Sequence, residues 1–283
     1  MSASFDTIAR DIERFAATPA GETLPADAGA AIEAVLDALE SGVLRAARRT
    51  PDGAWEAVPW VKRAILLAFR ISPVVAMPAL SGAGFVDKQT MPPRWFTPKD
   101  GVRLVPGGSA VRRGAHLAAG VVCMPPMYVN VGAWVGAGTM IDSHALVGSC
   151  AQVGERVHLS AAAQIGGVLE PVNASPVVIE DGVMVGGNCG VYEGTVVRSG
   201  AVLGAGVILT RGTPVYDLVR ETVYRGSSEH PLEIPENAVV VPGAREVTGS
   251  WAREQGLALQ TPVIVKYRDE KTDIATTLEQ WLR

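Results

Sequence analysis

Apolar residues recur at every sixth position through the middle of the chain. The first run has no miss and comprises Val111, Leu117, Cys123, Val129, Val135, Ile141, Val147, Val153, Leu159 and Ile165. A second run resumes the step at Ile179, Val185, Val191, Val197, Leu203 and Leu209. A period of six fits neither an α-helix nor an ordinary strand. It predicts a parallel β-helix, in which each hexapeptide forms one short strand and one corner and three hexapeptides complete a turn.

The other positions of the repeat indicate how such a coil is filled. The fifth residue of each six is small or branched, as in Ala133, Thr139, Ala145, Ala151, Val157 and Ala163, and the residue after the aliphatic one is often glycine, as in Gly136, Gly148, Gly154 and Gly166. We expect the aliphatic side chains to fill the axis, the fifth residues to be small because corners are crowded, and the glycines to adopt unusual corner backbone angles. Any chemistry must then use outward positions.

Two interruptions divide the repeat. The second run is displaced by two residues, which places an insertion loop at about 166–178, and the segment 213–233 is too polar and irregular for another coil. Ile234 and Val240 restore the step once and close the coil.

Helical periodicity marks the segments before the repeat. Three segments are predicted to be helical: "SFDTIARDIERFAA" carries Phe5, Ile8, Ile12 and Phe15 on one face, "AIEAVLDALESGVLRAA" carries Ile32, Val35, Leu36 and Leu39, and "PWVKRAILLAFRI" is apolar around Lys62 and Arg63. Pro and Gly break residues 73–101, which read as a connector with little regular structure. The tail carries a strand-like run and then a helix bearing Leu278 and Leu282.

The patterns together predict a mainly β protein in three parts. Residues 1–101 form an N-terminal helical domain with its connector, residues 102–245 form the β-helix, and residues 246–283 form a strand and helix tail. Hexapeptide coils are known to be left-handed, which the period alone does not show. Flat prism faces favour packing against copies of the same chain, so we expect a homotrimer with clefts between neighbouring coils.

Composition and charge limit the partners and the compartment. A formal net charge of -4 and a pI near 5.6 argue against binding to nucleic acid or an anionic membrane. The N-terminus lacks the basic start and apolar run of a secretory signal, and no segment is apolar for long enough to span a membrane. Cys123, Cys150 and Cys189 are odd in number and show no CxxC spacing. We expect a cytoplasmic protein without disulfides.

Several site types are disfavoured by the spacing of their residues. A zinc site needs closely spaced ligands, whereas the four histidines His116, His144, His158 and His230 are widely separated, so no metal is expected. No G-x-x-x-x-G-K-[ST] loop is present. Gly186 and Gly187 read as corner glycines rather than phosphate ligands.

The stretch "MPPMYVNVGAWVGAGTMIDSHALVGSCAQVGERVHLSAAAQIGGVLEPVNASPVVIEDG" resembles the signature region of tetrahydrodipicolinate N-succinyltransferases. The resemblance extends in order to "ALESGVLRAA", "WVKRAILLAFRI", "GVRLVPGGSAVRRGA" and "VIVKYRDEKTD". It implies succinyl transfer from succinyl-CoA to the amino group of ring-opened tetrahydrodipicolinate in lysine and diaminopimelate biosynthesis. An amine attacks a thioester only when unprotonated, so such a site needs a group that holds and deprotonates it.

The resemblance also implies site residues. In the family an aspartate in the segment matching "TMIDS" interacts with the amine, and that position is Asp142 here. The best-known branch has a second carboxylate at the position of Gly190, and the nearby Glu193 is the candidate to take its role. His144 stands where the family usually has Trp, and Ala161 and Ala162 replace glycines. Imidazoles titrate near neutrality, so His144 either assists proton removal or packs at the subunit boundary.

CoA binding requires local cations in this acidic chain. The candidates are Arg211, Lys266, Arg268 and Lys271, with Gly204 and Ala205 leaving room for the pantetheine arm; for each cation an ordinary solvated charge is the alternative. Two other functions stay open. A paralogue would use acetyl-CoA or a related amino dicarboxylate, and a scaffold would have no catalytic role.

Overall fold

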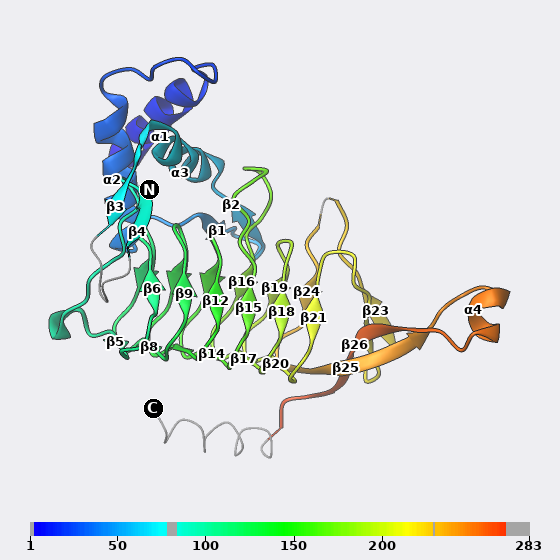
Figure 1. Ribbon diagram of the computed structural model, residues 1–283. Coiled ribbons are helices and arrows are strands. Elements are labelled where there is room, and N and C mark those ends of the chain that lie inside the picture. The colour runs from blue at the N-terminus through cyan, green and yellow to red at the C-terminus, as the bar shows by residue number, and fades with distance from the viewer. Residues whose placement is uncertain (1–2, 78–83, 229, 270–283) are drawn as a thin grey trace.

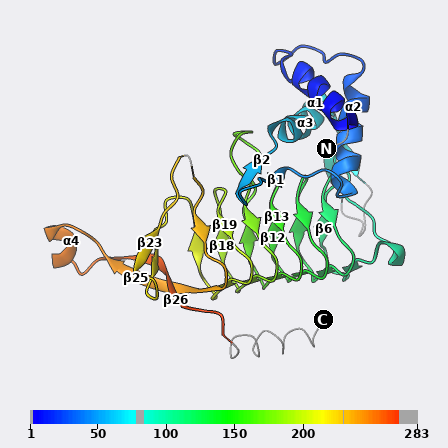
Figure 2. The same ribbon diagram turned by 180° about the vertical axis from the view of Figure 1, so that it is seen from behind.

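The computed structural model describes residues 3–77, 84–228 and 230–269. Three helices come first: α1 (Ala3–Ala16), α2 (Ala28–Glu40) and α3 (Pro59–Ile71). They pack around one apolar cluster that includes Ile12, Phe15 and Leu36, all with no exposed surface. Phe5 and Ile8 pack partly buried against it, so the predicted helical faces are confirmed. Figures 1 and 2 show these helices above the first turns of a long prism.

Two short hairpins accompany the helices. β1 (Ala47–Arg49) pairs antiparallel with β2 (Trp55–Ala57), and β3 (Val74–Met77) pairs antiparallel with β4 (Phe85–Lys88). The 3-10 helix η1 (Pro98–Asp100) follows. The prediction of little regular structure over residues 73–101 is therefore wrong, because Val74, Val75 and Val86 give this segment the β-branched content of a strand pair.

Parallel strands of mostly two residues form the three faces of the prism. The β6 face contains β6 (Ala110–Val111), β9 (Tyr128–Val129), β12 (Leu146–Val147), β15 (Gln164–Ile165), β18 (Gly190–Val191) and β21 (Ile208–Leu209). The β7 face contains β7 (His116–Leu117), β10 (Trp134–Val135), β13 (Gln152–Val153), β16 (Val178–Ile179), β19 (Val196–Val197) and β24 (Glu233–Ile234). The β5 face contains β5 (Arg103–Leu104), β8 (Val122–Cys123), β11 (Met140–Ile141), β14 (His158–Leu159), β17 (Met184–Val185), β20 (Val202–Leu203) and β25 (Ala238–Glu246).

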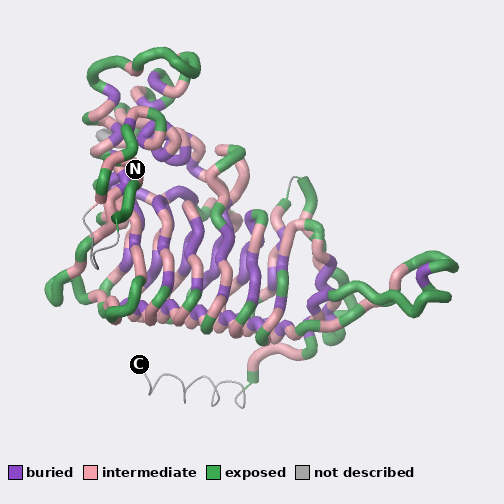
Figure 3. Tube along the Cα trace, viewed as in Figure 1, coloured by how far each residue is buried: buried purple, intermediate pink, exposed green. Residues whose placement is uncertain are grey.

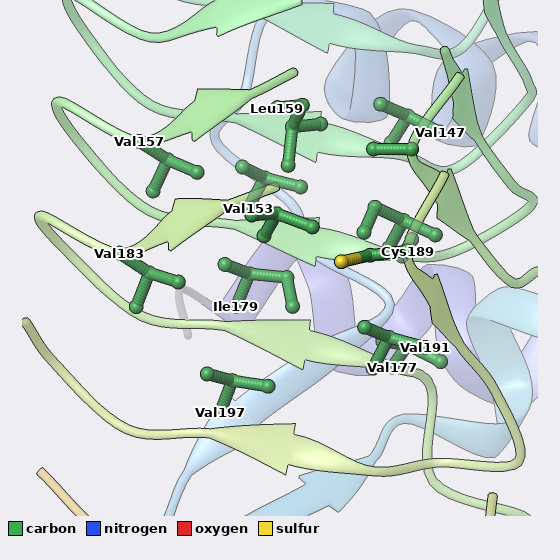
Figure 4. Packing of buried hydrophobic residues seen from close by; sticks show 14 of the residues in the cluster. Val147, Val153, Val157, Leu159, Val177, Ile179, Val183, Cys189, Val191 and Val197 are labelled. Carbon is green, nitrogen blue, oxygen red and sulfur yellow. The ribbon is translucent and has the colours of Figure 1, made fainter. Parts of the chain in front are cut away.

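The second residue of each prism strand points into the axis. Ile141 pairs with Leu159 and Val135 with Val153, so three hexapeptides complete a turn as predicted. These side chains are almost completely buried, and Figure 4 shows Val153, Ile179 and Val197 stacked in the interior. In Figure 3 the buried segments follow the coil from turn to turn. Since the axis is closed, only corners and outer faces can bind a ligand.

The corners correct one detail of the predicted repeat. Gly136 and Gly186 do not have positive φ; a Cβ at Gly136 would lie 2.6 Å from the backbone of Gly154, and one at Gly186 2.6 Å from the carbonyl oxygen of Leu203. The left-handed residue comes two positions later, at Gly138 (φ 68°) and at Asn188 (φ 56°). Glycine after the axial residue therefore permits close stacking of successive coils. The change of chain direction at the corner is made by the left-handed residue two positions later.

Both interruptions leave the coil at the same corner. We call the turns from the β5 face to the β6 face the Asp142 corner, and those from the β6 face to the β7 face the Glu193 corner. The loop between β15 and β16 and the longer segment between β21 and β24 both belong to the Glu193 corner. The second contains the hairpin of β22 (Val215–Asp217) and β23 (Thr222–Tyr224). In Figure 1 these loops project from the same side of the prism.

A two-stranded ribbon ends the described chain. β25 continues past the prism and pairs antiparallel with β26 (Ala258–Tyr267), with the short α4 (Ser250–Glu254) between them. The predicted tail strand is confirmed as β26. The predicted helix with Leu278 and Leu282 lies outside the described residues.

Candidate functional site

Asp142 begins a row of small residues along its corner. It follows β11, and the strand register places Ser160, Gly186 and Gly204 at the same position of successive turns. The backbone N–H of Asp142 donates to the carbonyl of Leu159, and the later members make the same kind of bond to the next turn. The row therefore has a backbone fixed by hydrogen bonds between turns. It carries a carboxylate at Asp142 and only short side chains, or none, at the positions that follow.

The Asp142 carboxylate is held by one of its two oxygens. Oδ1 accepts a hydrogen bond from the backbone N–H of Ser143 at 2.7 Å, and the residue is half-buried. Oδ2 accepts no hydrogen bond from the described part of the chain. A carboxylate fixed at one oxygen and open at the other is suited to binding an amine.

His144 occupies the left-handed position of the same turn. Its φ is 64°, its backbone N–H donates to Pro126 O at 2.5 Å, and its carbonyl accepts from Gln164 Nε2 at 3.1 Å. The side chain is exposed. Histidine tolerates this backbone conformation better than most residues, so corner geometry accounts for its presence without a chemical role.

A pocket of about 930 Å³ lies at the Glu193 corner, on the loop side of the prism. Its walls come from residues 166–168, 170–171 and 173–175, from the turn Tyr192–Gly194, from Thr210 and Arg211, and from residues around Ser227 and His230. Glu193 (φ 53°) and Gly194 (φ 74°) are both left-handed. The exposed Glu193 carboxylate accepts a hydrogen bond from the backbone N–H of Arg211 at 3.1 Å. A non-glycine residue in this conformation indicates a position held by its surroundings.

The ring of Tyr192 covers Gly190. A Cβ on Gly190 would lie 2.8 Å from the phenolic oxygen and 2.9 Å from Cζ, and one on Gly166 would lie 2.8 Å from Cδ1. Both positions must therefore be glycine for the ring to lie flat on the β6 face. The space in which a carboxylate at residue 190 would start is filled by a phenol.

Lys62 connects the helices to the wall of this pocket. It has no exposed surface, and its Nζ donates a hydrogen bond to Ala174 O at 2.5 Å. Burial lowers the pKa of this ammonium group, although the nearby Cys150 acts in the opposite direction. Leu169, from the same loop, packs against the helical cluster. The helical domain thus fixes the outer side of a loop whose inner side lines the pocket.

The six candidate CoA residues do not meet at one place. Gly204 and Ala205 lie on the Asp142 corner, whereas Arg211 lies in the pocket at the Glu193 corner. Lys266 forms an ion pair with Asp269 at 3.1 Å, and Arg268 Nη1 donates to the carbonyls of Gly182 and Gly200 at 3.3 and 3.2 Å. Lys271 lies outside the described residues. Two of the cations therefore already have protein partners.

Sequence reasoning missed Tyr192 and the contact of Lys62. The glycines at 166 and 190 were visible, but nothing in the sequence linked them to one ring. The position of Lys62 inside the apolar segment "PWVKRAILLAFRI" was the one feature of the sequence that indicated a buried cation.

The described residues contain neither a metal-binding cluster nor a membrane-spanning helix. Within them, no cluster of three or more His, Cys, Asp or Glu side chains is arranged to hold a metal ion. None of the helices in the described ranges is both long and apolar enough to cross a membrane.

Comparison with known proteins gives two family-model matches. Residues 8–71 match the model described as tetrahydrodipicolinate N-succinyltransferase N-terminal, and residues 176–211 match the hexapeptide repeat of succinyl-transferase. The chain is 42% identical over 267 residues to 2,3,4,5-tetrahydropyridine-2,6-dicarboxylate N-succinyltransferase of Polynucleobacter asymbioticus, covering 93% of this chain and 92% of the relative. It is 43% identical over 258 residues to the protein of the same name from Chelativorans sp., covering 89% and 88%.

One solved structure shares the fold. A putative 2,3,4,5-tetrahydropyridine-2-carboxylate N-succinyltransferase from Campylobacter jejuni superposes with a TM-score of 0.52 at 18% sequence identity. The match covers 83% of this chain and 62% of that chain. At this identity the likeness concerns the fold alone.

Proposed function

Because the chain belongs to the family of tetrahydrodipicolinate N-succinyltransferases, we propose that it is an acyl-CoA-dependent N-succinyltransferase of lysine and diaminopimelate biosynthesis. It transfers succinyl from succinyl-CoA to the amino group of ring-opened tetrahydrodipicolinate. The observation that carries this proposal is identity above 40% across about nine tenths of both chains. The carboxylate of Asp142, fixed at one oxygen and open at the other, supports it.

The proposed chemistry is an amine attack on a thioester. Asp142 holds the acceptor amine and takes its proton, a contribution of about a hundred- to ten-thousandfold in rate. The nitrogen bonds to the thioester carbonyl carbon, and backbone N–H groups at the corners stabilise the oxyanion. The C–S bond then breaks, and the proton taken from the amine passes to the sulfur, so that CoA leaves as the thiol. Holding both substrates in one cleft supplies a further part of the acceleration.

The row beyond Asp142 is the proposed track for the acyl-CoA arm. Ser160, Gly186 and Gly204 have short side chains or none, and Ala205 is exposed beside them. An extended pantetheine arm along this corner would bring the thioester to Asp142. Lys266, Arg268 and Lys271 stay candidates for the phosphates of CoA. Of the two described ones, Lys266 pairs with a side chain, Asp269, whereas Arg268 donates to two backbone carbonyls.

The proposal includes an assembly. We propose a cytoplasmic homotrimer of left-handed coils, with each site between neighbouring chains. Its support is the placement of the candidate carboxylates, since Asp142 and Glu193 lie on different corners of one prism. His144, exposed at the Asp142 corner, either assists proton removal or packs at this subunit boundary.

The test is an assay of free CoA release with tetrahydrodipicolinate, run in parallel with succinyl-CoA and acetyl-CoA. We expect turnover with succinyl-CoA. Preference for acetyl-CoA would identify the paralogue, and absence of turnover together with absence of CoA binding would identify a scaffold. Either result would overturn the substrate assignment.

A further inference from the structure

Arg211 presents an uncompensated cation to the pocket. Its backbone is fixed on both sides, because its N–H donates to Glu193 Oε2 at 3.1 Å and its carbonyl accepts from Gly226 N at 3.2 Å. The side-chain stem lies close to Gly226, where an added Cβ would be 2.9 Å from Arg211 Cγ. The guanidinium forms no ion pair with the described residues, and its Nε is buried without a hydrogen-bond partner. A guanidinium that lines a pocket without a carboxylate partner among the described residues is suited to binding a ligand anion.

Tyr192 adds a neutral donor to the same pocket. The ring is seated against Gly166 and Gly190, and its hydroxyl makes no hydrogen bond within the part of the chain that the structure describes. The backbone N–H of Tyr192 donates to Leu209 O at 2.9 Å, so Tyr192 and Arg211 lie on adjacent turns. Arg211 and Tyr192 both line this pocket, and a guanidinium together with a phenol is a donor set for a carboxylate.

The pocket also contains two carboxylates, Glu170 and Glu193. They disfavour a ligand that carries only negative charge. A ligand with a carboxylate and an amine on the same carbon satisfies both signs, the carboxylate at Arg211 and the amine at Glu193.

From this arrangement we infer that Arg211 and Tyr192 form the subsite for the carboxylate adjacent to the reacting amine of the acceptor. The inference rests on the proposed function and deepens it, because it assigns the acceptor-specific residues. It assigns Arg211, which the sequence offered as a candidate for CoA binding, to recognition of the acceptor.

The contribution of each acceptor carboxylate to binding can be measured by comparing the affinities of three ligands, without turnover. These are 2-aminopimelate, 6-aminohexanoate, which lacks the carboxylate next to the amine, and norleucine, which lacks the distant one. Calorimetry on the full-length protein with CoA present gives their affinities. For the unaltered protein we expect 2-aminopimelate to bind at least tenfold more tightly than 6-aminohexanoate.

Two substitutions complete the experiment. Arg211→Gln should abolish the preference over 6-aminohexanoate while keeping the preference over norleucine, and Tyr192→Phe should reduce the former by about fivefold. Matched controls are Arg156→Gln, which removes an exposed cation paired with Glu155, and Tyr128→Phe, which removes a hydroxyl from the same face. Both should bind like the unaltered protein.

Each contrary outcome has a distinct meaning. Loss of the preference over norleucine, or weaker binding of CoA alone, in Arg211→Gln would overturn the assignment of this subsite. Unchanged affinities in both pocket variants would do the same. Failure of the proposed function appears elsewhere, as absence of succinyl transfer by the unaltered protein.

Discussion

Asp142 and Glu193 lie at opposite edges of the same face of the prism. Asp142 precedes β12 and Glu193 follows β18, and these two strands are separated by β15 alone. The two carboxylates therefore differ by the width of the face and by two turns, roughly 10 Å along the axis. One chain therefore holds them at separate corners, and in the proposed trimer the Asp142 corner of one chain would face the Glu193 corner of its neighbour.

Co-assembly of two variants tests whether the two carboxylates act across a subunit boundary of the proposed trimer. Asp142→Asn should lower kcat by about a hundredfold or more because the amine loses its proton acceptor, and Glu193→Gln should also impair turnover. When the two variants are co-assembled in equal amounts, about a quarter of the boundaries in a cyclic trimer regain both carboxylates. We expect CoA release to recover to about that fraction of the unaltered rate.

The control for this experiment is the double variant, Asp142→Asn with Glu193→Gln in the same chain. Taken alone through the same assembly procedure, it should stay inactive. Mixed trimers no more active than the separate variants would show that the two groups do not share a site.

Thr139 places a hydroxyl among mostly apolar fifth-position residues. It is fully buried, donates to Gly154 O at 2.9 Å and accepts from Val157 N at 3.1 Å. Thr139→Val keeps the shape but leaves the two backbone groups without this partner, so it should cost about 1 to 3 kcal/mol of unfolding free energy. Urea denaturation measures the loss. The exposed Thr222→Val should change stability by less than about 0.5 kcal/mol, and an equal effect of both would contradict this role.

The axis of the prism could be predicted from the sequence because burial in a coil repeats with the chain. Ile141, Val147 and Val153 follow a strict period, and each is fully buried. The same period does not identify the residue with left-handed backbone angles in each corner. It predicts these angles for the glycines after the axial residues, whereas residues such as His144 adopt them. Spacing gives the repeat, whereas contact between turns decides which residue must be small.

The pocket could not be predicted because its contacts join distant parts of the chain. Lys62 and Ala174 are 112 positions apart, and the hydrogen bond between them forms only when the insertion loop folds back on the helices. Arg211 and Gly204 are close in sequence yet lie on different corners, since each hexapeptide crosses one face. The predicted Asp142 was accessible because it follows an axial residue directly and so must point outward.

Lys62 offers a test of how the helical domain supports the pocket. Lys62→Met removes the bond to Ala174 O without removing side-chain volume, so residues 168–175 should exchange their amide hydrogens faster while the axis of the prism stays protected. We also expect a higher KM for the acceptor, because the wall of the pocket is less fixed. Lys88→Met is the matched control, since Lys88 Nζ donates to Ser72 O at 2.8 Å away from this loop. Equal exchange in both variants would contradict the anchoring role.

His116 should make the stability of the protein depend on pH. Its ring stacks on Trp134 at 5.4 Å, its Nδ1 lies 3.0 Å from Glu40 O, and Arg94 and Arg45 lie nearby. Burial lowers the pKa of His116; the bond to Glu40 opposes this shift, and the two arginines add to it. The imidazole of His116 therefore binds a proton more readily in the unfolded chain than in the folded chain. The contribution of neutral His116 to the free energy of unfolding should be fully present above about pH 6.5 and decrease as the pH falls below that value. Urea midpoints between pH 8 and pH 5 measure this decrease, which should be smaller in His116→Phe; the same slope in both proteins would assign the dependence to other groups.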